Sequence, residues 1–124
     1  MSANKATVER YIEGFNRSDH AMILSCLTDD VVWDLPGAYH LEGKEAFDKE
    51  IENPAFIGPP TVVLTRLTEE NGVVAAEGMV SCARRDGEML KAAFCDVFLM
   101  TKDAKIRHLI SYLNEVKESL TGWK

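Results

Sequence analysis

The sequence predicts a single α+β domain in which three N-terminal helices pack against a strongly curved antiparallel sheet and enclose a pocket. Two observations carry this prediction. Apolar residues recur at helical spacing in the first part of the chain, and from Thr61 onward long β-type segments alternate with hairpin turns. We therefore expect helix, helix, strand, helix and then four strands, all within one domain over residues 1–124.

A first helix is predicted by an apolar stripe. Val8, Tyr11, Ile12 and Phe15 follow the i, i+3, i+4, i+7 spacing that places side chains on one face of a helix. The helix should end near Asn16. Tyr11 therefore carries a hydroxyl on the face that turns toward the core, where it is either an ordinary core tyrosine or a group with a specific polar partner.

Capping and helix-breaking residues define the next three elements. Asp19 is suited to cap the start of a second helix, and the polar residues 28–30 should end that helix. Residues 31–35 are then expected to form a short strand. Gly43 precedes a third helix, and the Asn-Pro pair at 53–54 marks its end.

Hairpin turns divide the rest of the chain into four strands. The turns are Asn-Gly at 71–72, Asp-Gly at 86–87 and the polar segment 102–105. Strands of about ten residues twist strongly, so the sheet should curl into a half-barrel that the helices close. The concave side would then hold an apolar pocket, which is the default ligand site of such a fold.

The composition argues against several partners. The 20 acidic and 14 basic residues give a net charge of -6, and no run of Lys and Arg forms a phosphate-binding stripe, so we expect no nucleic-acid partner. No window approaches the length of a membrane span, and the N-terminal stretch lacks the apolar core of a signal peptide. We expect a cytoplasmic protein with no membrane partner.

The cysteines and histidines predict neither disulfides nor a metal site. Cys26, Cys82 and Cys95 are widely spaced in apolar runs, as is typical of reduced core thiols. The three histidines show no ligand spacing, and the sequence has no phosphate loop or dinucleotide motif. We therefore expect no metal and no cofactor.

Two aspartates interrupt apolar strands. Asp96 is the one charged residue in the strand 92–100, where a carboxylate must pair, find donors or take up a proton. It is either a structural acceptor or a protonated donor in the pocket. Asp34 follows Trp33, and successive strand residues point to opposite faces, so only one of the two can face the pocket. Asp34 could instead satisfy the backbone of the turn at 36–37.

Apolar residues that face inward should form the pocket wall. We expect it to be lined by Phe15, Trp33, Phe47, Ile51, Phe56, Phe94, Phe98 and Leu109. On the opposite face of the sheet, Cys95, Val97 and Leu99 leave one side of a long strand too apolar for water, which predicts a homodimer through that face.

Four segments of the chain resemble a known family. Residues 10–16 and 27–30 are similar to the opening helices of bacterial ketosteroid isomerases, residues 32–37 to the strand that carries their base, and residues 96–98 to the strand with their protonated aspartate. The chain resembles, over nearly its whole length, the nuclear transport factor 2-like superfamily in its ketosteroid-isomerase and SnoaL-like branch. The resemblance implies a cystatin-like cone fold.

The resemblance also implies roles for three residues. Asp34 would be the general base, while Tyr11 and a protonated Asp96 would donate hydrogen bonds to an enolate oxygen. The segment before Asp34 is one residue shorter than in the isomerases, so Leu35 is the alternative inward residue.

Three functions remain open at this stage. The first is an isomerase- or cyclase-like enzyme that shifts a proton on an enolisable carbonyl of an apolar substrate. The second is a non-catalytic binder of a hydrophobic metabolite, with Tyr11 and Asp96 as polar anchors. The third is a dimerisation module whose pocket is a relic.

Overall fold

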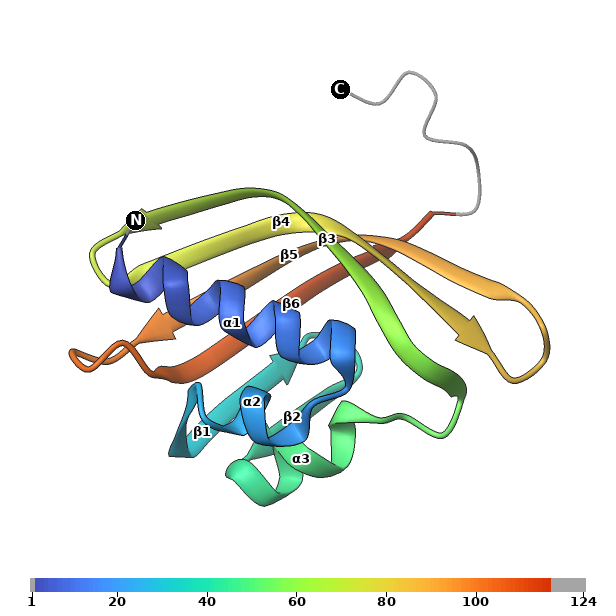
Figure 1. Ribbon diagram of the computed structural model, residues 1–124, viewed down its shortest axis with the longest axis horizontal. Helices are drawn as coiled ribbons and strands as arrows, with labels where there is room; N and C mark the ends of the chain where they lie inside the picture. Colours follow the sequence, from blue (N-terminus) through green and yellow to red (C-terminus); the bar gives the residue numbers. More distant parts are fainter. Residues whose placement is uncertain (1, 117–124) are drawn as a thin grey trace.

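The structure is a computed structural model that describes residues 2–116. Its helices and strands follow one another in the order α1 (Ala3–Arg17), α2 (His20–Leu24), β1 (Leu27–Leu35), β2 (Tyr39–Glu42), α3 (Lys44–Ile51), β3 (Phe56–Glu70), β4 (Val73–Arg84), β5 (Met89–Met100) and β6 (Ile106–Glu115). The α+β class and the curved sheet are as predicted, with helices over the concave side of the long strands (Figure 1).

All six strands form one sheet, in the order β2-β1-β6-β5-β4-β3. The prediction of a wholly antiparallel sheet is wrong at one contact, because β1 and β6 run parallel. No hairpin joins these two strands, so the long intervening segment leaves their relative direction free. The sequence also missed β2, which pairs with β1; at four residues with half-buried and exposed positions it has too little alternation to detect.

Helix α1 begins and ends where its sequence allows. The Ser2 side chain accepts a hydrogen bond from the Lys5 amide, and Ser18 adopts a left-handed conformation (φ 51°) that closes the C-terminus. Val8, Tyr11 and Ile12 are buried, as the stripe predicted. In Figure 1 the helix lies across the concave face of the long strands. The ring of Tyr11 packs against Phe98 of β5 on that face.

The hairpins form at the predicted turns. Asn71 and Gly72 both have positive φ, at 52° and 76°, as a tight turn between twisted strands requires. Two register shifts in β3 bend the sheet, and at the second Gly78 of β4 approaches it closely. A Cβ atom on Gly78 would come within 2.1 Å of the Val63 carbonyl oxygen, so this curvature requires glycine.

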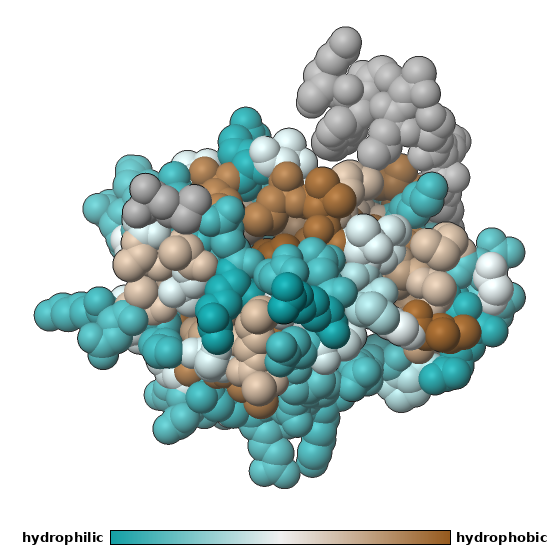
Figure 2. All heavy atoms as spheres, viewed as in Figure 1, coloured by the Kyte–Doolittle hydropathy of each residue, from teal (hydrophilic) through white to brown (hydrophobic). Residues whose placement is uncertain are grey.

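The core fills one end of the concave face and leaves the other end open. Phe47 and Phe98 have no exposed surface, and the Tyr11 ring packs edge-on against Phe98 at 5.3 Å between ring centroids. None of the helices within residues 2–116 is long and apolar enough to cross a membrane. Hydrophilic side chains cover most of the helical face in Figure 2, while apolar residues reach the surface above α1, over β3 and β4.

Candidate functional site

A cavity of about 510 Å³ opens between α1, the C-terminal end of α3 and the concave side of the sheet. Its wall is mainly apolar and includes five of the residues expected there: Phe15, Trp33, Ile51, Phe56 and Phe94. The other three, Phe47, Phe98 and Leu109, are corrected by the structure. They are fully buried in the closed end of the core, because inward-facing side chains of the central strands and α3 meet there before the cavity begins.

Asp96 is the carboxylic acid on the sheet wall of the cavity. It lies on β5 between Phe94 and Phe98 on the same face, and its strand partners are Ala76 and Ser111. Asp96 is half-buried and lines the cavity. Burial raises the pKa of Asp96 from 3.8 to about 7, and a hydrogen bond with the Ser111 side chain opposes that shift. The carboxyl is therefore protonated below neutral pH.

Tyr11 faces the same cavity from the helical side. Only 2% of the residue is exposed, and its ring contacts Phe15 at 5.0 Å and Phe98 at 5.3 Å between centroids. Burial, and then the nearby Asp96, raise the pKa of the Tyr11 hydroxyl well above its ordinary value. The structure thus brings together two of the three predicted polar residues, each with a proton to donate.

Ser111 also lines the cavity, although the sequence did not single it out. It is buried on β6, and its hydroxyl oxygen accepts a hydrogen bond of 3.0 Å from the Trp33 indole. That bond leaves the hydroxyl hydrogen free for Asp96, which lies opposite Ser111 in the neighbouring strand. The alternation of β6 could have identified Ser111 as an inward-facing residue, because Leu109, Ser111 and Leu113 lie on one face of that strand.

Asp34 lies outside the cavity, and the predicted base is corrected accordingly. Asp34 pairs with Ile110 of β6, whereas Asp96 pairs with Ser111. Adjacent residues of a strand point to opposite faces, so the two aspartates do as well. Trp33 and Leu35 line the cavity, in accord with the alternative that Leu35 faces inward.

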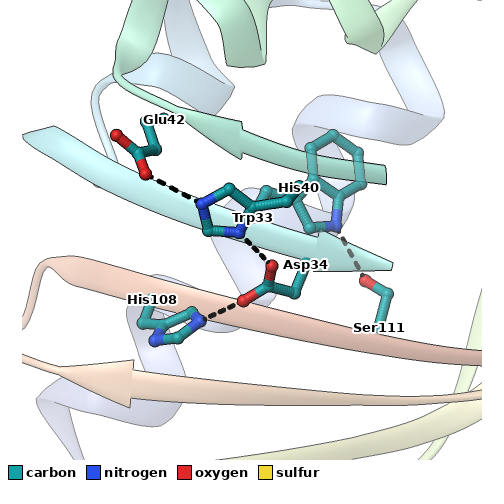
Figure 3. A network of polar contacts seen from close by, with 6 residues as sticks. All are labelled: Trp33, Asp34, His40, Glu42, His108 and Ser111. Carbon is teal, nitrogen blue, oxygen red and sulfur yellow. Dashed lines mark hydrogen bonds and ion pairs between the residues drawn. The ribbon is translucent and has the colours of Figure 1, made fainter. Parts of the chain in front are cut away.

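On the outer face Asp34 belongs to a polar cluster with two histidines (Figure 3). His108 Nε2 lies 2.7 Å from Asp34 Oδ2, His40 Nδ1 contacts Oδ1, and His40 Nε2 lies 2.9 Å from a Glu42 carboxylate oxygen. His40 and then His108 lower the pKa of Asp34, while Glu42 and then Asp34 raise the pKa of His40. Among residues 2–116, no group of three or more His, Cys, Asp or Glu side chains has a geometry that could hold a metal ion.

The mouth of the cavity is polar. Tyr39 of β2 lines it, and burial raises the pKa of its hydroxyl, so this phenol also stays protonated. Sequence patterns did not indicate Tyr39, because the strand β2 that carries it is too short to show a period. Glu50 and Glu52 at the end of α3 line the mouth as well, facing the turn between β4 and β5 that carries Arg85.

Comparisons with known proteins agree with this architecture. An NTF2-like protein of unknown function from Burkholderia pseudomallei is similar at a TM-score of 0.83 and 19% identity, over 92% of each chain. An LEH-like epoxide hydrolase from M. tuberculosis is similar at 0.78 and 17% identity, over 90% of this chain and 83% of that one.

A third similar structure is a proposed ketosteroid isomerase from Kribbella flavida, at a TM-score of 0.72 and 16% identity, over 94% of this chain and 82% of that one. At such identities these likenesses show the fold alone. No curated protein matches the sequence. The model of the SnoaL-like domain matches residues 8–109, which is most of the chain. The protein therefore belongs to the SnoaL-like family, within the nuclear transport factor 2-like superfamily.

Proposed function

We propose that the protein binds a small, largely apolar organic molecule that presents one oxygen atom to Tyr11 and Asp96. One observation carries the proposal: a phenol and a protonated carboxyl face the same apolar cavity from opposite walls. A hydrogen-bond acceptor held there would meet two proton donors with no competing water.

The pairing favours an oxygen that carries partial or full negative charge. A buried carboxylic acid donates a stronger hydrogen bond than an amide or alcohol, and its strength increases as charge develops on the acceptor. A planar phenolate or an enolate is therefore the preferred occupant of this end. Trp33 and Phe15, whose rings approach at 6.3 Å between centroids, would pack against its apolar body.

Binding of a phenolic probe tests the proposal. Wild type is titrated at about pH 6 with a naphthol by calorimetry, beside Tyr11→Phe, Asp96→Leu and the matched control Asp34→Asn on the outer face. Loss of one donor should weaken binding by about tenfold, which corresponds to about 1.4 kcal/mol, while Asp34→Asn should bind as wild type does. Equal affinities in all four proteins would contradict the proposal.

Proton transfer on an enolisable carbonyl is the second candidate function. With Asp34 outside the cavity, Asp96 is the group that suits it, because a pKa of about 7 populates both its forms near neutral pH. The Asp96 carboxylate would take a proton from the carbon beside the carbonyl, and Tyr11 would stabilise the enolate oxygen. The proton would then return to the original or a conjugated carbon.

Deuterium exchange distinguishes catalysis from binding. A bicyclic aryl ketone in D₂O is followed by NMR with wild type, Asp96→Asn and Asp34→Asn. A catalyst should exchange the proton beside the carbonyl at a rate that rises through about pH 7, and Asp96→Asn should abolish this exchange. No exchange above the buffer background, despite binding, would leave the protein a binder.

A further inference from the structure

The mouth of the cavity contains one basic side chain among the described residues that line it, Arg85. Arg85 follows the last residue of β4, and two hydrogen bonds fix it to the segment after α3. Its Nε donates to the Pro54 carbonyl oxygen at 2.5 Å, and its backbone amide donates to the Ala55 carbonyl at 3.1 Å. The guanidinium is therefore held at the rim by atoms of the opposite wall.

Among residues 2–116, no hydrogen bond or ion pair uses the two terminal nitrogens of Arg85. Glu50 accepts a hydrogen bond from Asn53 at 3.2 Å, and Glu52 lies 2.6 Å from His20 Nε2. Within residues 2–116 no carboxylate comes within ion-pair distance of Arg85, whereas its neighbour Arg84 pairs with Glu115 at 3.4 Å. A fixed guanidinium with unused, coplanar donors matches a carboxylate in shape and charge.

An apolar wall separates this cation from the neutral donors. The inward side of β5 runs from Asp96 through Phe94 and Ala92 to Leu90 beside the turn, a span of roughly 20 Å along the strand. The cavity thus has a polar end at Tyr11 and Asp96, a long apolar middle and a charged rim. At the rim Arg85 is the one basic side chain among the described lining residues, and the carboxylates of Glu50 and Glu52 lie at the same mouth. The occupant of the cavity should have the same three parts in the same order.

We propose that the ligand is an amphipathic organic acid, with a carboxylate on Arg85, an apolar body along β5 and a second oxygen atom that accepts hydrogen bonds from Tyr11 and Asp96. This inference rests on the proposed function, because it assumes that the cavity binds an apolar molecule. It adds the substrate class: a monocarboxylate that is oxygenated far from its acid group.

A matched pair of probes tests the carboxylate. We would titrate ω-hydroxydodecanoic acid and its primary amide into wild type, Arg85→Gln and Arg84→Gln, the control being an adjacent arginine that does not line the cavity. Wild type should bind the acid about five- to tenfold more tightly than the amide, since the rim is open to solvent. Arg85→Gln should remove this preference by weakening the acid more than the amide, and Arg84→Gln should keep it.

Tyr11→Phe separates failure of this inference from failure of the proposed function. It should weaken acid and amide by the same factor, because both keep the distal hydroxyl. If both probes bind, both respond to Tyr11→Phe and the acid is not preferred, the carboxylate assignment is wrong while the binding function stands. If neither probe binds and the naphthol titration also fails, both are wrong.

Discussion

Asp34 and Asp96 lie on the two strands that flank β6, and they differ in the face of the sheet they occupy, in their neighbours and in the direction of their pKa shifts. Asp34 is on the outer face beside His40 and His108, and these neighbours lower its pKa. Asp96 is on the inner face among aromatic rings, and burial raises its pKa to about 7. Their β6 partners are consecutive residues, so one step of strand alternation separates an ionised surface acid from a protonated donor.

The largest effect should come from removing the titration of Asp96. Its native pKa exceeds the unfolded value, so the native state retains a proton between about pH 4 and 7 and wild-type stability falls as the pH rises through that range. Asp96→Asn does not titrate. Urea melts should show equal stability at about pH 4, and a gain for the variant on the order of 4 kcal/mol at about pH 8.

If Asp96→Asn instead lowers the stability by about 1–3 kcal/mol at both pH values, this prediction is wrong. Such a loss would make Asp96 an ionised structural acceptor whose donors the amide leaves unpaired. Tyr11 would then lose its partner donor, and the proposed binding mode would fail with it.

The inner face of the sheet has a closed end, filled by the core, and an open end at the cavity. Two phenylalanines of β5 lie one at each end. Phe98 has no exposed surface and contacts the Tyr11 ring, so Phe98→Ala should cost about 3 kcal/mol or more. Phe94 lines the existing cavity, so Phe94→Ala should cost about half as much, because it enlarges a space already present. Equal losses in chemical denaturation would mean that the cavity is closed around Phe94.

Much of the fold followed from local sequence signals. The stripe of α1, the capping residue Asp19 and the Asn71-Gly72 turn each depend on neighbouring residues, and each formed as predicted. The parallel contact between β1 and β6 depends on segments far apart in the chain, and β2 is too short to show a period. Local sequence patterns therefore could not predict the parallel contact or the strand β2.

The candidate site was predicted in part, for the same reason. Tyr11 and Asp96 were found because each breaks an apolar pattern within its own helix or strand. The face of Asp34 depends on the register of β1 against β6, and Ser111 acquires its role only from Trp33 and Asp96 across the sheet. Polar residues whose role comes from a distant partner leave no local signal.

The outer face should also carry a dimer interface. Val97 lies opposite Ala75 and Ile110 on that face, and Tyr112 there is 50% exposed, which leaves apolar surface in the single chain. We expect a homodimer at micromolar concentration in size-exclusion chromatography with light scattering. Val97→Lys should give a monomer, while the inner-face change Asp96→Asn should not alter the mass. A monomeric wild type would contradict this prediction.

The smallest effect should come from His40, with a pH dependence opposite to that of Asp96. His40 contacts Glu42 through one ring nitrogen and Asp34 through the other, and only the protonated ring donates from both. Its folded pKa is raised, so its contribution is complete below about pH 6.5 and is lost as the pH rises through the folded value. Asp34, with a lowered pKa, contributes above about pH 4 and loses its contribution on further acidification.

The stabilising window of the outer cluster therefore lies between about pH 4 and 6.5. His40→Gln should lower the urea midpoint at about pH 5.5, and the difference from wild type should shrink at about pH 8.5. The effect should be small, because His40 is 55% exposed and solvent screens its ion pairs. Across the same pH range the Asp96→Asn difference should grow. A His40→Gln difference that stays constant with pH would show that the ring contributes packing alone, and that charge on the outer face is not what sets Asp34 apart from Asp96.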